Sequence, residues 1–201
     1  DRYHFLTDEE FNILLMGETF LWSLRYGLQM VADRSENRLL FDHQRKIAKL
    51  LGYKDSDQAL GVELMMQRYY RTVLALAELA DVILQYFDDF YLNPEREQKT
   101  EKLNNRFQIT NGYIETIDDG VFDRSPYAII EIFLLMAQNP KIKGIRSTTI
   151  RLIREHQHLI DDSFRSDLAN TTMFREILRT PHRLNITLSN MLKYNVLTRY
   201  L

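Results

Sequence analysis

Pairs of acidic residues are the first feature of this chain with a spacing that suits catalysis. Asp55-Ser56-Asp57 has the Asp-x-Asp spacing with which enzymes that act on nucleoside triphosphates hold two divalent cations. Such a pair should lie on a strand after a Gly-Ser turn, whereas this one follows Leu51-Gly52-Tyr53 and precedes a helical pattern. Asp88-Asp89, Asp118-Asp119 and Asp161-Asp162 fall at expected helix or turn boundaries, where Asp is common as a cap. We therefore interpret all four groups as capping residues.

The five histidines are a second possible source of metal ligands. The chain has no His-Asp dipeptide, and His156 and His158 are two residues apart, so on a helix they point in different directions. His156 shares a helix face with Leu152 and Ile153, which indicates a half-buried histidine with satisfied hydrogen bonds. With no cysteine and no Gly-rich phosphate loop, the sequence predicts no metal site, no nucleophilic serine motif and no catalytic residue of its own.

Arg25, Arg34, Arg38 and Gln44 form the one polar cluster with two open interpretations. These residues surround an expected turn that also carries Glu36 and Asp42. Guanidinium groups that converge on one surface could bind a triphosphate or dock a neighbouring domain, because each presents a planar fork of N–H donors. Alternatively, the same side chains form an internal salt-bridge network that fixes the turn. We keep both possibilities, with nucleotide or interdomain contact as the functional candidate.

Composition limits the class of protein. The 201 residues contain 45% hydrophobic residues, enough for a real core. The 26 basic and 28 acidic residues nearly balance, so we expect no nucleic-acid partner. There is no apolar run of about 18 residues and no signal-peptide pattern, so we expect neither a membrane span nor secretion. The absence of cysteine fits a reducing, cytoplasmic compartment. Because the chain starts without Met, we expect it to be an excised piece of a longer protein.

The first half of the sequence has helical patterns. Thr7-Asp8-Glu9-Glu10 is a capping box that starts a helix reaching about Ala32. Asp42 is the expected N-cap of a short second helix, which Gly52 ends in the left-handed conformation. A long spine helix follows from Gln58 to Phe87, roughly 45 Å in length, against which the first helix should pack antiparallel. The expected seam on the spine helix consists of Val62, Met66, Tyr69, Val73, Leu76, Ala80, Ile83 and Phe87.

The second half contains one strand signal among helices. Phe107 to Ile114 reads as a hairpin, because Asn111-Gly112 tolerates the positive φ angles of a tight turn. Ser125-Pro126 predicts the start of a buried helix that Asn139-Pro140 ends. Further helices are expected at about 147–160, 171–179, 184–193 and 196–200.

Together these signals predict a mainly α protein: a helical bundle with one long spine helix and a short β-hairpin near residues 106–117. The predicted organisation is a helical bundle at residues 1–92, a polar linker at 93–105, which contains Pro94 and a charged run, and a hairpin with a helical subdomain at 106–201.

Several stretches resemble a known family. These are FLWSLRYGLQMVADRSENRLLFDHQRKIAKLLGY (20–53), MMQRYYRTV (65–73), FQITNGYIE (107–115), SPYAIIEIFLLMAQNP (125–140), GIRSTTIRLIREHQHLI (144–160) and NVLTRYL (195–201). They resemble the helical segment that follows the nucleotidyltransferase head in bifunctional PII uridylyltransferase/uridylyl-removing enzymes of bacterial nitrogen control. The resemblance covers nearly the whole chain. It differs at Gln29, Asp33 and Asn37, where the family leads us to expect His, Gly and Asp.

The resemblance implies that the chain is a central scaffold domain between a transferase head before Asp1 and a His-Asp hydrolase domain after Leu201. The intact enzyme would transfer UMP from UTP to the PII protein and remove it again in response to glutamine, with Mg²⁺ or Mn²⁺ as cofactor. It would be a nucleotidyltransferase and a hydrolase together, whereas the chain alone would be inactive. The alternatives are a free-standing all-α interaction module and the equivalent domain of glutamine synthetase adenylyltransferase.

Overall fold

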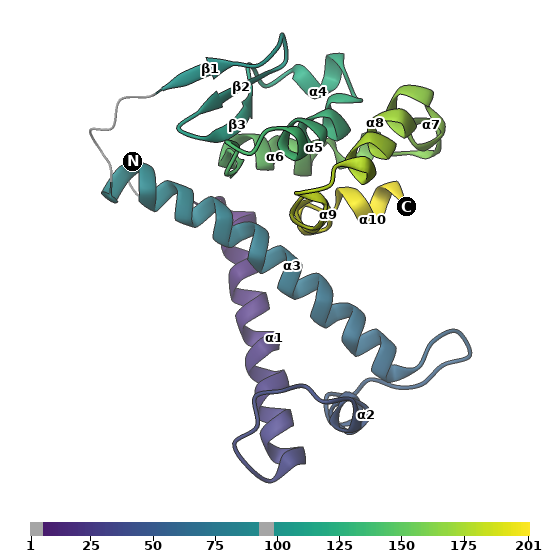
Figure 1. The fold of residues 1–201 in the computed structure, drawn as a ribbon. Helices are drawn as coiled ribbons and strands as arrows, with labels where there is room; N and C mark the ends of the chain where they lie inside the picture. Colours follow the sequence, from purple (N-terminus) through teal and green to yellow (C-terminus); the bar gives the residue numbers. More distant parts are fainter. Residues whose placement is uncertain (1–5, 93–98) are drawn as a thin grey trace. The chain divides into compact units, whose positions relative to one another are not determined.

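The structure, a computed structural model, describes residues 6–92 and 99–201 and is mainly α-helical (Figure 1). It confirms the predicted fold class of helices with a long spine helix and a short hairpin. The helices are α1 (Asp8–Ala32), α2 (Phe41–Leu50), α3 (Gly61–Phe87), α4 (Val121–Arg124), α5 (Ala128–Gln138), α6 (Ser147–Glu155), α7 (Asp162–Ser166), α8 (Leu168–Arg179), α9 (Leu184–Lys193) and α10 (Val196–Tyr200), with a π-helix η1 (Asp88–Leu92) and a 3-10 helix η2 (His156–Leu159).

The chain divides into two compact units, Asp1–Leu79 and Ala80–Leu201. The boundary lies inside α3, so this helix contributes its first nineteen residues to one unit and the rest to the other. The sequence instead predicts a polar linker between the two parts at residues 93–105. That segment also contains a strand, and its residues 93–98 lie outside the described residues.

Helix α1 begins at the predicted capping box. The Thr7 hydroxyl accepts the backbone N–H of Glu10 at 3.1 Å, and the Glu10 carboxylate accepts the backbone N–H of Thr7 at 3.0 Å. Two of the unpaired N–H groups at this helix end are thereby satisfied. At the other end, Asp33 takes the left-handed conformation, with φ of 51°, and the helix stops where predicted.

Helices α1 and α3 approach closely at Gly17. A Cβ atom on Gly17 would lie 2.9 Å from a terminal carbon of Leu76, so the glycine permits this approach. Figure 1 shows the helices crossing, with α2 between their diverging ends. The core there combines Leu24 and Leu28 of α1, Ile47 and Ala48 of α2, and Met65 of α3. The prediction that α1 packs along the spine helix therefore holds only near the crossing, because α2 fills the rest.

The start of α2 differs from the prediction. Asp42 lies in the first turn, whereas Leu40 is the N-cap and has no side-chain cap. The chain enters the helix earlier because the Gln44 side chain donates a hydrogen bond to the Leu39 carbonyl at 3.2 Å and holds the preceding backbone. The end is as predicted, since Gly52 has a φ of 82°, in the left-handed region that favours glycine.

The buried face of α3 is rotated relative to the predicted seam. Met65, Leu79 and Val82 are buried, whereas Val73, Ala80 and Phe87 of the predicted seam are exposed. Apolar residues occur on more than one face of α3, so the helical period alone could not identify the face that is buried. At its start, Asp55 accepts the backbone N–H of Gly61 at 2.7 Å, which supports the capping interpretation of Asp55.

The second unit is built on a four-stranded sheet in the order β1-β2-β3-β4, formed by β1 (Thr100–Lys102), β2 (Phe107–Thr110), β3 (Tyr113–Thr116) and β4 (Gly144–Ile145). The predicted hairpin is β2–β3, and Asn111 and Gly112 have φ of 54° and 90°. Residues 100–102 of the predicted linker form β1, which pairs antiparallel with β2. Sequence missed β1 because its side chains are all exposed and show no apolar alternation.

Helix α5 is the centre of the core in this unit, as its composition predicted. Ala128, Ile129, Ile130, Ile132 and Phe133 are all fully buried. Contacts with α8 and α9 and with the sheet-side residues Phe107 and Ile114 complete the core. The helix begins at Ala128 rather than at Ser125-Pro126, because Ser125 and Pro126 form a preceding turn whose carbonyls accept the N–H groups of Ala128 and Ile129.

Gln85 connects the last turns of α3 to the β4–α6 junction. Its side-chain nitrogen donates to the Ile145 carbonyl at 2.7 Å, and its side-chain oxygen accepts the backbone N–H of Ser147 at 2.8 Å. Gln85 is buried, so removing it leaves two backbone groups unsatisfied away from water.

Replacing Gln85 with alanine should therefore destabilise the chain by about 2–4 kcal/mol, the cost of leaving those two groups without partners. Urea unfolding followed by far-UV circular dichroism measures the change. The exposed Gln138→Ala variant is the matched control and should unfold like the parent chain. Equal stability of the Gln85 and Gln138 variants would contradict this role for Gln85.

Candidate functional site

The turn between α1 and α2 is organised around the buried carboxylate of Glu36. One carboxylate oxygen accepts the backbone N–H groups of Asn37 and Arg38 at 3.0 and 2.9 Å. The other accepts the Arg34 guanidinium at 3.1 Å, and the Arg38 guanidinium lies 3.5 Å from the first. Glu36 thus satisfies the backbone of the turn and neutralises part of two cations, as the salt-bridge interpretation predicted.

The same contacts leave much of both arginines facing solvent. The side chains of Arg34 and Arg38 are 65% and 77% exposed. A guanidinium has five N–H donors, and the contacts with Glu36 use one donor of each. The turn therefore presents two partly neutralised cations on one surface, so an anion-binding role is chemically compatible with the salt bridges.

Gln44 lies beside a second feature, a pocket of about 480 Å³ between α2 and the start of α3. Apolar and polar side chains both line it; the lining residues are Phe41, Asp42, Gln44, Arg45, Leu60, Val62, Glu63 and Met66. The Gln44 amide nitrogen is engaged with the Leu39 carbonyl, and the Glu63 carboxylate accepts the Leu60 backbone N–H at 2.9 Å. Both polar groups thus hold the backbone that frames the pocket.

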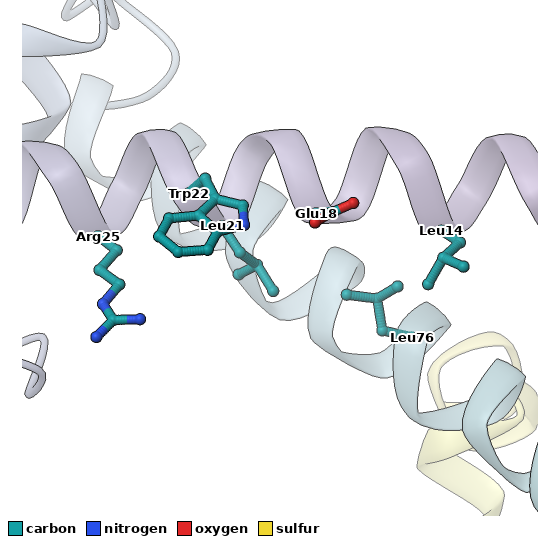
Figure 2. Close-up of a pocket in the computed structure, with 6 residues that line it drawn as sticks. All are labelled: Leu14, Glu18, Leu21, Trp22, Arg25 and Leu76. Atoms are coloured by element: carbon teal, nitrogen blue, oxygen red, sulfur yellow. The ribbon is translucent and has the colours of Figure 1, made fainter.

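Arg25 belongs to a different surface. It lines a smaller pocket of about 310 Å³ on α1, together with Leu14, Glu18, Leu21, Trp22 and Leu76 (Figure 2). The Arg25 guanidinium lies 5.5 Å from the centre of the Trp22 ring, within the range of a cation–π contact. Figure 2 shows Leu76 of α3 below the α1 residues, so the pocket lies beside the crossing at Gly17. The four sequence candidates thus fall into three settings: the Glu36 turn, the α2 pocket and the α1 pocket.

The pKa of Glu36 is lowered from its ordinary value of 4.5. The main cause is the hydrogen bond from the Arg38 backbone N–H, supported by the Asn37 N–H and the charge of Arg38, while burial acts in the opposite direction. A lowered pKa in the folded state means that the charged form stabilises the fold. The turn is therefore held by an ionised carboxylate.

Asp161 and Asp118 have the capping and turn roles that the sequence predicts, whereas Asp89 does not. Asp161 accepts the Phe164 backbone N–H at 2.8 Å as the N-cap of α7, and this bond lowers its pKa. Asp118 accepts hydrogen bonds from the Gly120 N–H and the Arg124 guanidinium. Both bonds lower the pKa of Asp118, and the Arg124 bond is the larger cause. Asp89 pairs with Arg146 at 2.8 Å, a long-range contact rather than a cap.

His156 is mostly buried and bonded through both ring nitrogens. Nδ1 lies 2.7 Å from the Leu152 carbonyl, and Nε2 lies 3.2 Å from the Asp123 carboxylate. The His158 ring stacks on it with centroids 6.2 Å apart. These contacts match the predicted half-buried, satisfied histidine. Across residues 6–92 and 99–201, no group of three or more His, Asp or Glu side chains is arranged to hold a metal ion.

Sequence reasoning missed two ionic networks in the second unit. Glu131 on α5 accepts the Arg106 guanidinium at 2.6 and 2.7 Å and the Asn104 amide at 3.0 Å, and the Glu131 bond raises the pKa of Arg106. Asp81 accepts Lys193 and the Tyr194 hydroxyl, each at 2.7 Å. The partners are 25 to 113 residues apart, so no local pattern could have revealed them.

Comparison with known proteins places the chain in a family. Residues 1–84 match the family described as GlnD PII-uridylyltransferase, and residues 107–200 match the family described as Uridylyltransferase GlnD third domain. The bifunctional uridylyltransferase/uridylyl-removing enzyme of Pseudomonas aeruginosa PAO1 is 49% identical over 200 residues, which cover 100% of this chain. The chain belongs to the bifunctional uridylyltransferase/uridylyl-removing enzyme family. This confirms the resemblance stated from the sequence.

The match covers only part of each relative. The chain spans 22% of the P. aeruginosa enzyme, and also 22% of the enzymes of the same name from P. fluorescens Pf-5 and P. putida W619, which are 49% and 47% identical over 197 residues. No solved structure matches the chain. The two matching regions of the uridylyltransferase family fall on either side of residues 85–106, which include the end of α3 and the strand β1. Within the described residues, no helix is long and apolar enough to cross a membrane.

Replacing Glu36 with glutamine tests the role of the ionised carboxylate in this segment of the uridylyltransferase family. The pKa of Glu36 is lowered on folding, so its stabilising effect is complete well above pH 4.5 and is lost as the pH falls through the lowered folded-state pKa. At pH 7 the variant should melt at a lower temperature than the parent, and the difference should shrink as the pH falls below 4. Melting curves from pH 2 to 7 measure this, with the exposed Glu9→Gln variant as control; a difference that does not depend on pH would contradict the electrostatic explanation.

Proposed function

We propose that this chain is the scaffold, or linking helical domain, of an enzyme that uridylylates and deuridylylates the PII nitrogen regulatory protein with UTP, in response to glutamine. The observation that supports a scaffold most directly is the use of its charged groups. Glu36, Glu131, Asp81 and Asp161 each hold backbone or side-chain donors within the fold. A scaffold needs such contacts, because two active sites can be held in place only by elements that are themselves rigid.

The chemistry would then belong to flanking transferase and hydrolase domains of the same longer polypeptide. Mg²⁺ or Mn²⁺ would serve those domains, where a divalent cation neutralises triphosphate charge. The relatives carry both activities in their names and are more than four times as long as this chain, which supports flanking domains. We further propose a cytoplasmic setting, in which UTP and PII are the partners of the intact enzyme.

The Glu36 turn is the surface that we assign to an interdomain or nucleotide contact. Arg34 and Arg38 point donors to solvent from a backbone that Glu36 holds rigid, and such fixed guanidiniums suit a phosphate or carboxylate partner. Gln44 supports the same segment through Leu39. A rigid turn loses little conformational entropy on binding, so it suits a docking role.

A second candidate function is a helical module that binds a partner helix. It is favoured by the apolar pocket on α1, which three leucines and an exposed tryptophan line. The adenylyltransferase alternative receives no comparable support, because the relatives reported above are uridylyltransferases. The scaffold domain would act only within a longer enzyme, whereas the helix-binding module could act without one.

The scaffold proposal predicts that the purified chain neither transfers nor removes uridylyl groups. The chain would be incubated with UTP, Mg²⁺ or Mn²⁺ and PII, and separately with uridylylated PII, and the products separated by mass spectrometry. No change in PII mass is expected. A turnover that persists through successive purification steps and disappears with a destabilising variant such as Gln85→Ala would contradict the proposal.

Alanine replacement of Arg34 and Arg38 in the full-length enzyme separates nucleotide contact from structural support. If the turn contacts nucleotide, KM for UTP should rise several-fold while the melting temperature changes little. If it serves only as a fold or domain contact, the melting temperature should fall and KM should stay constant. The Arg71→Ala variant, which removes an exposed arginine of α3, is the matched control.

A further inference from the structure

Helix α1 carries a row of exposed residues on the side that faces away from the core. Leu15, Thr19, Trp22 and Tyr26 follow one another at spacings of four, three and four, and all four are exposed; we call this row the α1 seam. Trp22 is 58% and Tyr26 is 68% exposed. Alternating steps of three and four are the spacing of a helix that packs against another helix.

Two opposite charges flank the α1 seam at the same position of successive heptads. Glu18 and Arg25 are seven residues apart, so they lie on one edge of the seam. Arg25 lies over the Trp22 ring, and no ion pair involving Glu18 or Arg25 is found among residues 6–92 and 99–201. Both charges are exposed and can meet a partner.

The order of these charges selects one geometry of pairing. Glu18 and Arg25 are equally far from the midpoint between Leu21 and Trp22, so a second helix related by a two-fold axis at that point would run antiparallel. Glu18 of each copy would then face Arg25 of the other. In a parallel pair, each charge would instead face the opposite edge of the seam, where Met16, Ser23 and Met30 carry no charge.

The pocket in Figure 2 supplies an apolar site beside the α1 seam. Leu14, Leu21 and Leu76 line a volume of about 310 Å³ beside Trp22. The pocket exists because α3 meets α1 at Gly17, which brings Leu76 next to the seam. An indole ring of a second copy, near the two-fold axis, is of a suitable size and chemistry to enter it, and a buried tryptophan is a frequent anchor of protein interfaces.

We propose that α1 is a self-association surface, on which two copies of this chain pair antiparallel through the α1 seam, with reciprocal Glu18–Arg25 ion pairs and Trp22 in the pocket of the partner. This goes beyond the proposed function and does not depend on it, since it concerns no uridylyl transfer. Other occupants of the same surface, such as another segment of a longer polypeptide, are outcomes that the tests below separate.

The first test uses the fact that Trp22 is the single tryptophan of the chain. Emission spectra would be recorded over a dilution series and compared with sedimentation equilibrium of the same samples. As concentration rises, the chain should convert from monomer to dimer, and the emission maximum should shift to shorter wavelength over the same range. A chain that stays monomeric with a constant emission spectrum up to the highest soluble concentration would overturn the proposal.

The second test exchanges the two charges. The single variants Glu18→Arg and Arg25→Glu each replace two attractive pairs with two repulsive ones, so dimerisation should weaken by about tenfold or more. The double variant Glu18→Arg with Arg25→Glu restores opposite charges in the antiparallel pair and should recover most of the affinity. The Arg175→Glu variant, an exposed charge reversal on α8, is the control and should dimerise like the parent chain.

Circular dichroism of each variant confirms that it is folded before its association is scored. A folded double variant that remains as weak as the single variants would overturn the antiparallel pairing. In the full-length enzyme, the Trp22→Cys variant reports the accessibility of position 22 to a maleimide reagent. Shielding of that position in an enzyme that sediments as a monomer would also overturn the proposal, because another segment of the polypeptide would then cover the seam.

Discussion

The close approach of α1 and α3 at Gly17 is the constraint on which the first unit depends. A Cβ atom at this position would lie 2.9 Å from a terminal carbon of Leu76, so any larger residue would require the Leu76 side chain to shift. Beyond the crossing the helices diverge, and the space between them must be filled, which α2 does with Ile47 and Ala48. The turn that carries Arg34 and Arg38 is the connection that this insertion requires. The α1 pocket and the Glu36 turn are thus two consequences of one helix crossing.

In the second unit, ion pairs and hydrogen bonds between residues far apart in the sequence hold the elements together. Arg146 pairs with Asp89 and lies 3.9 Å from Glu115, while Glu115 accepts the Gln108 and Thr110 side chains. Glu131 and Asp81 each hold two or more donors. Breaking one partner of a half-buried pair leaves the other charge poorly solvated, so such networks resist local rearrangement. The charges of Glu115, Glu131 and Asp81 are thus engaged in contacts within the fold.

Sequence predicted what depends on local chemistry and missed what depends on distant partners. The Thr7 capping box, the Asn111-Gly112 turn, the left-handed Gly52 and the buried α5 each rest on a few neighbouring residues, and each is present. The buried face of α3 was misassigned because several faces of that helix are apolar, and packing against α1 and α2 decides which face is buried. The strand β1 was missed because its exposed residues gain order only by pairing with β2. For the candidate site, the Arg34 and Arg38 contacts followed from the neighbouring Glu36, whereas the separate location of Arg25 depended on the length and direction of α1.

The Glu36 turn and the α1 seam differ in polarity and in how well their groups are satisfied, so they suit different kinds of contact. The Glu36 turn is polar, and its backbone is already satisfied, so it is stable in water without a partner and can bind one reversibly. The α1 seam is different, because a tryptophan and a tyrosine exposed side by side on one helix cost free energy in water unless something covers them for much of the time. Apolar surfaces such as the α1 seam commonly form permanent contacts, whereas polar surfaces such as the Glu36 turn suit contacts that form and break. The two surfaces therefore suit two different kinds of contact, one apolar and lasting and the other polar and reversible.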